Sequence, residues 1–402
     1  MMVHGQNGEL ERIVRVKKVK KNTKLTLAGR KPFENYGIVN PPVYRTSTVL
    51  FENTKELGKA IKNRFNRTYY GRYGTPTTFA LEEGIAEIEN GHKTIATSSG
   101  MSSISISLLS FLSKNDHCLI SDCTYYPTKK FAVKMLLKFG VNVDFYDPKN
   151  INSIKKKINK KTKIIFMESP SSLTFEIEDM SAIIKIAKKK KILTIIDNSW
   201  ATPLYFSPIR QGIDISILAA TKYISGHADN MLGLITVKNE KLFLQIKDTA
   251  VNLGDCPGPQ ECYLGLRGLR TLSARLERHR SNALKIARLL ENNNKVLKVF
   301  HPALPNNDNY TLWCKYFSGS TGLFSFILKE QSKNVIYKMI DKLKLFKLGF
   351  SWGGYESLIL PVFPKNERKI AKWKEKGILL RIHIGLEDVD DLTKDLFQAF
   401  KL

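Results

Sequence analysis

The fold of this chain is decided by residues 192–223, which read ILTIIDNSWATPLYFSPIRQGIDISILAATKY. Two short apolar runs stand in this stretch, and each ends in polar residues: Asp197 after ILTII, and Thr221 with Lys222 after ISILAA. Runs of this length that are apolar throughout are typical of strands buried on both faces of a parallel sheet. Groups that follow such strands meet at the carboxyl edge of the sheet, where open α/β sheets bind ligands. We therefore expect Asp197 and Lys222 to lie in one site.

The same alternation continues on both sides of this stretch. Helical spacing of apolar residues predicts helices over residues 78–89, with Thr77 or Thr78 as the N-cap, and over 101–113, 127–139 and 180–190. Strands that alternate with such helices predict βαβ units and a mostly parallel sheet with helices on its faces. Further strands are predicted at TIAT (94–97), CLISD (118–122), VNVDFYD (141–147) and TKIIFMESP (162–170).

The pattern changes at two places and so divides the chain into three parts. Residues 1–74 have Gly and Pro punctuation without sustained periodicity, which predicts an irregular N-terminal arm. Residues 75–268 form the predicted α/β domain. Residues 269–402 begin with a long predicted helix over about 269–292. They continue with apolar runs such as GLFSFILK (322–329) and LLRIHIG (379–385), which indicate a smaller α+β domain.

The chain is strongly basic, with 64 Lys and Arg against 37 Asp and Glu and a formal net charge of +27. Such a charge raises the question of nucleic acid or an anionic membrane as a partner. Most of the basic residues are lysines, however, and they are interleaved with apolar residues in segments such as SIKKKINKKTK (153–163) and KIAKKKK (185–191). Specific nucleic-acid readers favour arginine. We interpret these segments as solvated helix faces and expect neither nucleic acid nor membrane as a partner.

Composition excludes several other classes of protein. Hydrophobic residues make up 43% of the chain and charged residues 25%, which excludes wholesale disorder and collagen-like structure. Five cysteines, with no His pair at zinc-ligand spacing, predict neither a disulfide framework nor a metal site. Residues 1–24 lack the apolar region of a signal peptide, and no apolar run reaches membrane-spanning length, so we expect a cytoplasmic enzyme.

Polar groups after four of the predicted strands have complementary chemistry. Residues 98–101 (SSGM) open a helix, where free backbone N–H groups favour an anion such as phosphate. A lysine in apolar surroundings, such as Lys222, can have a lowered pKa and attack an aldehyde. The Asp197 carboxylate can keep a heterocyclic nitrogen protonated. A tyrosine ring after CLISD, Tyr125 with Tyr126 as a competitor, can stack on a flat cofactor. Together these groups describe a site for pyridoxal 5′-phosphate.

In these motifs the chain resembles the Cys/Met-metabolism family of pyridoxal-phosphate (PLP) enzymes, and within it the bacterial cystathionine β-lyases. The resemblance extends from about residue 25 to the C-terminus, and its most specific part is AATKYISGHAD (219–229) with the upstream IDN (196–198). It implies the PLP-dependent transferase fold of the aspartate-aminotransferase type I, an α/β fold with a mostly parallel sheet flanked by helices and a smaller α+β C-terminal domain. Other matching stretches are YYGRYGTPT (69–77), SSGM (98–101), ESPSS (168–172), RGLRTL (267–272), SGSTGLFSF (318–326), SWGGYESL (351–358) and LRIHIGLEDVDDL (380–392).

The resemblance implies roles around the cofactor ring. Lys222 resembles the lysine that holds the cofactor aldehyde covalently and moves the substrate proton. Asp197 resembles the partner of the ring nitrogen. Tyr125 resembles the tyrosine that stacks on the ring and assists catalysis, since it stands two residues before the proline in TYYP (124–127).

The resemblance also implies a phosphate site shared between subunits. The backbone N–H groups of Gly100–Met101, helped by the Thr221 hydroxyl, resemble the phosphate donors. The chain departs from the family at Ala219, where a serine commonly adds a second hydroxyl. Tyr70 and Arg72 resemble a pair that reaches into the neighbouring subunit's phosphate site. The arm 1–74 would then contribute to the neighbouring subunit, a homodimer would be the minimal active unit, and a homotetramer is expected.

On the substrate side, Arg381 resembles the arginine that binds the substrate α-carboxylate, and Ser351 and Trp352 resemble residues that line the same side. The related γ-lyases and γ-synthases carry an acidic residue just before this serine, whereas this chain has Phe350 there. An apolar side chain cannot accept a hydrogen bond from a distal substrate amine. The resemblance therefore implies a carbon–sulfur lyase of methionine biosynthesis, a cystathionine β-lyase that converts L-cystathionine to homocysteine, pyruvate and ammonia.

Three alternatives stay open. A PLP-dependent alanine racemase activity, sole or secondary, would use the same substrate carbanion with a different protonation. A cystathionine γ-lyase or γ-synthase type of enzyme would share the motifs. A polyanion binder on an inactive scaffold would have lost the pair of Lys222 and Asp197, which this chain retains.

Overall fold

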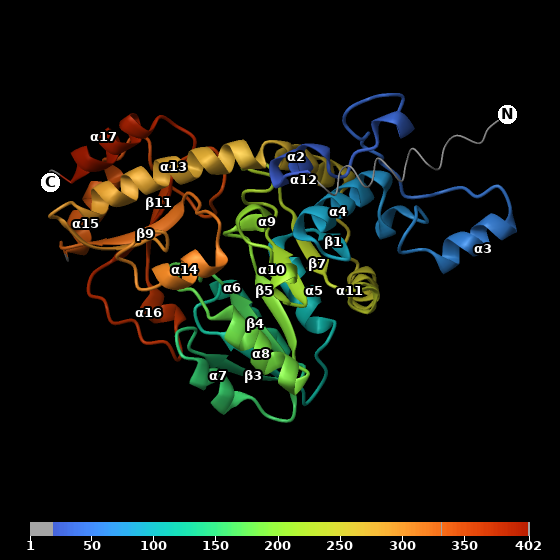
Figure 1. Ribbon diagram of the computed structural model, residues 1–402, viewed down its shortest axis with the longest axis horizontal. Helices are drawn as coiled ribbons and strands as arrows, with labels where there is room; N and C mark the ends of the chain where they lie inside the picture. The colour runs from blue at the N-terminus through green and yellow to red at the C-terminus, as the bar shows by residue number, and fades with distance from the viewer. Residues whose placement is uncertain (1–18, 331, 401–402) are drawn as a thin grey trace.

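The computed structural model describes residues 19–330 and 332–400, and its centre is a seven-stranded sheet in the order β1-β7-β6-β5-β4-β2-β3 (Figure 1). Strands β2 to β6 pair in parallel, which confirms the predicted mostly parallel sheet. Strand β7 was not predicted, and it runs antiparallel to both β1 and β6. The strands are β1 (Lys93–Thr97), β2 (His117–Ser121), β3 (Asn142–Tyr146), β4 (Thr162–Glu168), β5 (Leu193–Asp197), β6 (Ile215–Leu218) and β7 (Gly233–Val237).

Helices cover both faces of this sheet because alternate strand residues point to opposite sides. On one face, Ile196 and Leu218 join a hydrophobic cluster with α4 (Pro76–Glu89) and α8 (Met180–Lys190). On the other face, Ile195 and Ile217 join a cluster with α5 (Gly100–Leu109) and α11 (Glu240–Asn252). Every residue of β2, β6 and β7 is buried. The carboxyl edge of the sheet is therefore a rigid platform for the side chains that follow each strand.

Three predicted helices differ from the structure in detail. The N-cap of α4 is Thr75, whose side chain accepts the Thr78 N–H, because Pro76 occupies the first helical position and needs no N–H partner. The helix expected over 127–139 is α6 (Tyr126–Phe131), which continues as a wider π turn over 132–136. The helix expected over 269–292 is α13 (Leu272–Glu291). It is preceded by α12 (Pro259–Arg270), which was not predicted, and the two helices meet at Thr271.

A second sheet of five strands, ordered β10-β11-β12-β9-β8, lies beside the first. Figure 1 shows α13 extending from α12 along this sheet toward α17 (Val389–Ala399). The strands are β8 (Val296–Phe300), β9 (Leu323–Leu328), β10 (Lys347–Leu348), β11 (Leu358–Val362) and β12 (Leu379–His383). Other helices after residue 100 are α7 (Ile151–Lys157), α9 (Thr202–Tyr205), α10 (Pro208–Gln211), α14 (Tyr310–Tyr316), α15 (Lys333–Asp341) and α16 (Pro364–Glu367).

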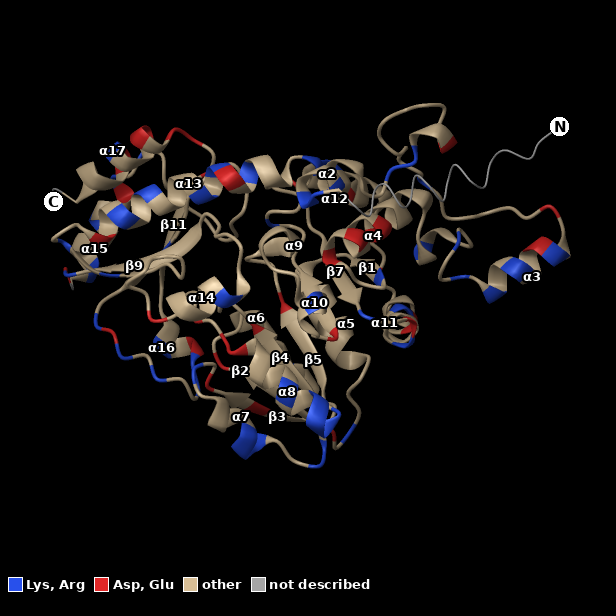
Figure 2. Cartoon of the chain, in the orientation of Figure 1, with Lys and Arg blue, Asp and Glu red and all other residues tan. Residues whose placement is uncertain are grey.

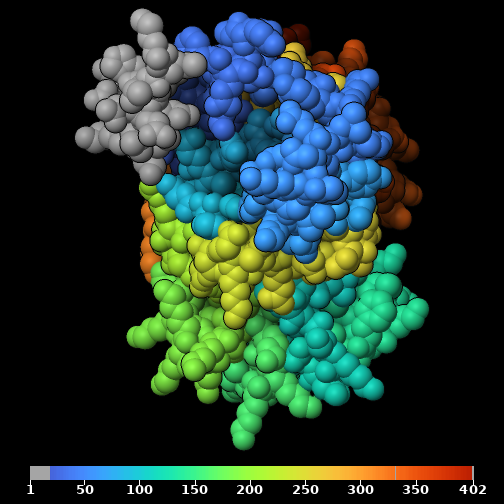
Figure 3. All heavy atoms as spheres, turned by 90° about the vertical axis from the view of Figure 1, so that its right-hand side faces the viewer, coloured from blue at the N-terminus to red at the C-terminus, as the bar shows by residue number. Residues whose placement is uncertain are grey.

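The N-terminal part of the described chain holds α2 (Lys21–Leu27) and α3 (Thr54–Lys62). Helix α2 is anchored, since Leu25 is fully buried and the Arg270 guanidinium donates to the carbonyls of Leu25 and Ala28. Beyond it the chain spreads over one side of the molecule, which Figure 3 shows face on. Tyr36 and Leu50 there are 100% and 90% exposed. Residues 1–24 precede the part of the chain that carries the family resemblance. Most of them, residues 1–18, lie outside the described residues.

The lysine-rich helices lie on the outside of the molecule. Figure 2 shows their basic residues gathered on α7 and α8. Lys155 and Lys188 are exposed, whereas the interleaved Ile154 and Ile184 are buried, as the prediction of solvated helix faces requires. Across residues 19–330 and 332–400, no helix combines the length and the apolar character needed to cross a membrane.

Candidate active site

The strand ends of β5 and β6 bring Asp197 and Lys222 together. The two strands are parallel neighbours, with Asp197 paired to Ile217. Ser199 connects them, because its N–H donates to the Asp197 carboxylate at 2.9 Å and its hydroxyl accepts the Ala219 N–H at 2.6 Å. Burial raises the pKa of Asp197, while the hydrogen bonds from Ser199 and the charge of Lys222 lower it. This carboxylate is thus buried at the sheet edge with a cation nearby.

Lys222 lies between the two sheets. Its ammonium donates to the Ser351 hydroxyl and stands 5.4 Å from the centre of the Trp352 ring. Burial lowers the pKa of Lys222 to about 8, and the positive charge of Arg381 adds to the effect, while Asp197 opposes it. An amine with this pKa is partly neutral near pH 7 and can therefore act as a nucleophile or a base.

The turn that carries Ser351 and Trp352 packs closely against the backbone of Lys222 and Tyr223. Gly353 has a φ of +90°, and a Cβ there would stand 2.9 Å from the Tyr223 nitrogen, so only glycine is accommodated. Its N–H donates to His383 Nε2 at 3.1 Å. The Trp352 ring packs 5.3 Å from the Tyr223 ring. Residues of the smaller sheet are in this way held against the lysine of the larger one.

The start of α5 offers a cradle for an anion. Ser99 caps the helix by accepting the Ser102 N–H. The helix begins at Gly100, within the stretch 98–101 that the sequence predicted to open it. A Cβ on Gly100 would lie 2.6 Å from the Ala219 Cβ, so glycine is required where the helix start meets the end of β6. Met101 follows in the first turn. The Thr221 hydroxyl exchanges hydrogen bonds with the backbone of Leu232. The cradle fits the phosphate of the predicted cofactor because the N-terminus of a helix favours an anion through its backbone N–H groups and its dipole.

Tyr125 and Arg381 complete the cluster. Tyr125 precedes α6, and its N–H donates to the Glu168 carboxylate at 2.7 Å. Burial raises the pKa of the Tyr125 phenol; the charges of Glu168 and Asp197 raise it further, and Arg381 lowers it. Arg381 projects from β12, and its guanidinium donates to the Ser351 carbonyl at 3.0 Å. The structure thus brings together Tyr125, Asp197, Lys222, Ser351 and Arg381.

Glu168 is a member of this cluster to which the sequence analysis gave no role. It ends β4 and is paired in register with Asp197. Burial raises the pKa of Glu168 well above its usual range, and the negative charge of Asp197 raises it further. The strand-end rule that selected Asp197 and Lys222 applies equally to TKIIFME, so the signal was present in the sequence.

Tyr70 and Arg72 lie in the N-terminal part of the chain and are exposed. The Arg72 guanidinium donates to the Val251 carbonyl at 2.5 Å and packs over the Tyr73 ring. Their predicted place in a neighbouring subunit's phosphate site stays a prediction.

Known proteins resemble this chain over nearly its full length. A family model described as Cys/Met metabolism PLP-dependent enzyme matches residues 22–401. A putative cystathionine beta-lyase of Rhizobium johnstonii is 42% identical, with 94% of this chain and 95% of the relative covered. An L-alanine/L-glutamate racemase of Wolbachia pipientis is 40% identical, with 95% and 97% covered.

Two solved structures share the fold. The metB structure from Corynebacterium glutamicum superposes with a TM-score of 0.89 at 28% identity, and covers 96% of this chain and 99% of its own. The structure of a putative O-acetylhomoserine (thiol)-lyase from Campylobacter jejuni superposes with a TM-score of 0.86 at 28% identity, and covers 95% and 100%. The second of these carries a pyridoxyl-lysine monophosphate.

Proposed function

The chain belongs to the Cys/Met metabolism PLP-dependent enzyme family and has the PLP-dependent transferase fold; from this premise we propose that it is a cystathionine β-lyase. In the proposed reaction the Cβ–S bond of L-cystathionine breaks, homocysteine leaves, and one water molecule hydrolyses the remaining three-carbon unit to pyruvate and ammonia. The observation that carries the proposal is Lys222, a lysine of lowered pKa that contacts Ser351 and lies near Asp197 and Arg381. The name of the Rhizobium relative supports the same activity.

The enzymes of this family use pyridoxal 5′-phosphate, which when bound supplies an electron sink for negative charge at the substrate Cα. In this chain Lys222 would hold the aldehyde, Asp197 the ring nitrogen and Tyr125 the ring face. The N-terminus of α5, at Gly100–Met101, would hold the phosphate, with the Thr221 hydroxyl beside it. Ala219 supplies no hydroxyl at the position where family members commonly have serine.

Each side chain of the cluster has a separate role in the proposed reaction. Arg381 binds the substrate α-carboxylate through its planar fork, and the Ser351 carbonyl holds that fork in place. Lys222, oriented by the Ser351 hydroxyl, takes the Cα proton as a general base. The Tyr125 phenol stays protonated because burial and two neighbouring carboxylates raise its pKa. It can therefore donate a proton to the departing sulfur, as Lys222 can after it has taken the Cα proton.

The subunit arrangement is part of the proposal. Tyr70 and Arg72 would complete the phosphate site of a second copy, so a homodimer is the minimal active unit and a homotetramer the expected assembly. The exposed apolar side chains of the N-terminal part, Tyr36 and Leu50 among them, would be covered in such an assembly.

Product analysis tests the proposal directly. Protein loaded with pyridoxal phosphate is incubated with L-cystathionine, and the keto acid and thiol are identified, with L-cystine and L-alanine as comparison substrates. Pyruvate with homocysteine is the expected result. Release of 2-oxobutyrate with cysteine would assign a γ-lyase instead, and absence of either keto acid would overturn the lyase proposal. Lys222→Ala is the inactive control.

A racemase activity is a second candidate, because the Wolbachia relative carries that name at 40% identity. Two proton-bearing groups, Lys222 and Tyr125, stand near the same carboxylate, Asp197. If one of them takes the Cα proton and the other returns a proton to the opposite face, the configuration at Cα inverts. Incubation of L-alanine in deuterated water tests this: formation of D-alanine with deuterium at Cα supports the racemase, and unlabelled L-alanine contradicts it.

A further inference from the structure

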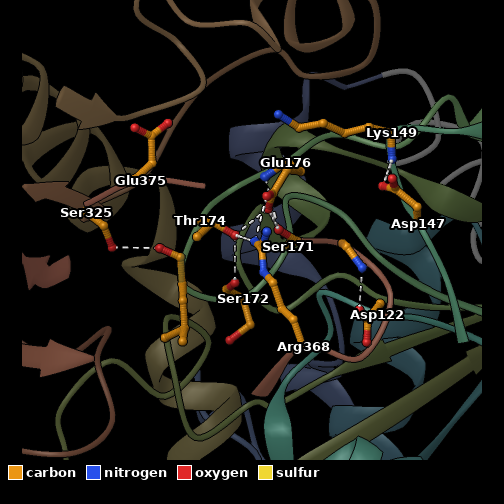
Figure 4. Close-up of polar contacts among 12 residues, drawn as sticks. Asp122, Asp147, Lys149, Ser171, Ser172, Thr174, Glu176, Ser325, Arg368 and Glu375 are labelled. Atoms are coloured by element: carbon orange, nitrogen blue, oxygen red, sulfur yellow. Dashed lines mark hydrogen bonds and ion pairs between the residues drawn. The ribbon is translucent and has the colours of Figure 1, made fainter. Parts of the chain in front are cut away.

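The segment between β11 and β12, residues 363–378, belongs to the smaller sheet but is fastened to the larger one. It leads into β12, the strand that carries Arg381. Its fastening points are residues 367–371, and their partners come from the larger sheet and the loops around it (Figure 4). The partners include Asp122 and Lys129, which stand before and after Tyr125 in the sequence.

Asp122 is the main fastening point. It directly follows β2 and is only 1% exposed. Its carboxylate accepts the N–H groups of Lys369 at 2.9 Å, Ile370 at 2.5 Å and Ala371 at 2.7 Å. The side chains of Lys369 and Ile370 are exposed, so it is the backbone of the segment that Asp122 holds.

Lys129, a residue of α6, contacts both Asp122 and the segment that Asp122 holds. It is 2% exposed, and its ammonium donates to the Asp122 carboxylate at 2.6 Å, to the Asp122 carbonyl at 2.7 Å and to the Glu367 carbonyl. All three N–H donors of the ammonium are thereby used. Tyr125 lies in the short stretch of chain between Asp122 and Lys129, so these two residues join the turn that carries Tyr125 to the segment that leads to Arg381.

A second buried ion pair supports the first. The Arg368 guanidinium donates to the Glu176 carboxylate at 2.7 Å and to the Thr174 hydroxyl at 2.5 Å (Figure 4). Both side chains are at least nine-tenths buried. Glu176 also accepts from the Ser171 hydroxyl, so its position is set within the larger sheet's own loop.

Buried ion pairs are poor devices for stability, because desolvation of both charges offsets much of their attraction. What such pairs can supply is a unique arrangement of the elements they join. Here the joined elements carry Tyr125 and Arg381, and the positive charge of Arg381 lowers the pKa of the Tyr125 phenol. Both would contact the cofactor or the substrate in the proposed reaction.

We propose that Asp122 and Lys129 are positioning residues that set Tyr125 against Arg381 across the boundary between the two sheets. The inference rests on the roles given to Tyr125 and Arg381 in the proposed function. Loosening this fastening would misplace the α-carboxylate binder relative to the cofactor, while the lysine, the aspartate and the phosphate cradle would stay in place. Amino-acid binding should then weaken more than cofactor binding.

The test uses Asp122→Asn and Lys129→Met in the full chain loaded with pyridoxal phosphate. Lys129→Met removes the three hydrogen bonds and keeps an unbranched stem. The matched control is Asp214→Asn. Asp214 is also a buried carboxylate, accepts the Thr194 N–H and pairs with Lys238, but it lies at the opposite edge of the sheet.

Three quantities are measured: cofactor content, the dissociation constant for glycine from the absorbance change of the bound cofactor, and hydrogen exchange of the 369–371 amides. We expect about tenfold weaker glycine binding and faster exchange in both variants, with cofactor content as in the parent protein. Asp214→Asn should leave glycine binding unchanged.

Unchanged glycine binding in Lys129→Met would overturn the proposal, and so would an equal loss in Asp214→Asn. Fast exchange of the 369–371 amides in the parent protein would overturn it without any variant, even if Asp122→Asn does not fold. Glycine binding needs no carbon–sulfur cleavage. A protein that binds glycine but releases no pyruvate from L-cystathionine would therefore contradict the proposed lyase and leave this inference standing.

Discussion

The Lys222 ammonium donates a hydrogen bond to the Ser351 hydroxyl, and this contact ties a strand end of the larger sheet to a turn of the smaller one. The two residues lie far apart in the sequence, and Ser351 has a φ of +78°, which is uncommon outside glycine. The turn is thus held in a strained conformation at the point where it meets the lysine.

Removal of the Ser351 hydroxyl should slow the reaction more than it weakens substrate binding. Ser351→Ala removes the acceptor that orients Lys222 but keeps the carbonyl that holds Arg381. A hydrogen bond to a charged group contributes about 1.5–3 kcal/mol, so kcat should fall at least about tenfold. Pyruvate release measures kcat and KM separately. Ser351→Gly suits the positive φ and serves as the comparison: recovery of kcat in it would assign the defect to backbone strain.

Reconstitution of the cofactor-free protein should speed up as the pH rises toward 8. The pKa of Lys222 is about 8, and only its neutral amine attacks an aldehyde, so the neutral fraction grows through this range. Arg381→Leu removes a positive charge that lowers this pKa, and the midpoint should therefore move to higher pH. The initial absorbance change after addition of pyridoxal phosphate measures the rate. A midpoint that does not move would contradict the coupling of Arg381 to Lys222.

Acid should destabilise the protein through buried histidines, His279 among them. Burial lowers the pKa of His279 from its ordinary 6.5 to about 4, and its Nδ1 faces the Ile384 carbonyl at 2.7 Å. Between these two values the unfolded chain binds a proton that the folded chain does not. The free energy of unfolding is therefore highest above pH 6.5 and falls toward pH 4, by on the order of 3 kcal/mol for this residue. Urea unfolding at several pH values measures it.

His279→Gln should show a shallower dependence of stability on pH than the parent protein. An identical slope in His279→Gln would mean that His279 titrates alike in the folded and the unfolded chain, which would contradict the prediction.

Ala219→Ser should tighten binding of pyridoxal phosphate. The Ala219 Cβ stands beside Gly100 at the start of α5, where the phosphate would lie. A hydroxyl there adds a hydrogen bond to an anion, so the dissociation constant should fall about tenfold. Titration of the cofactor-free protein by absorbance measures this constant. Ala228→Ser, at an exposed site in the same motif, should not change it.

Mixed variants should recover activity if two chains share each active site. Lys222→Ala and Arg72→Ala should each be inactive alone. A mixed dimer contains one site with both residues intact, so equal mixing after dissociation and reassembly should restore about a quarter of the parent activity. Unfolding and refolding each variant alone is the control. Mixtures that stay inactive would place Arg72 outside the neighbouring site.

The sequence predicted the centre of this protein because the relevant patterns are local. Apolar runs that end in polar residues, here Asp197 and Lys222, indicate buried strands. The polar residues mark the carboxyl edge of the sheet, where these strands end. The strand β7 was not predicted, although GLITV (233–237) is a short apolar run like the others. The long helix expected over 269–292 is α13, whereas α12 before it was not predicted. The resemblance of the motifs then supplied the family, which the comparison with known proteins confirmed.

What the sequence by itself determined is the mostly parallel sheet and the chemistry gathered at its carboxyl edge. Only the tertiary structure decided which side chains of the smaller sheet face that edge, how the Ser351 turn meets Lys222, and that Asp122 holds the backbone of residues 369–371. The reason is physical. The periodicity of a strand or helix depends on residues that are close together in the sequence. Contacts between residues far apart in the chain depend instead on how two hydrophobic cores pack and on which buried charges form pairs.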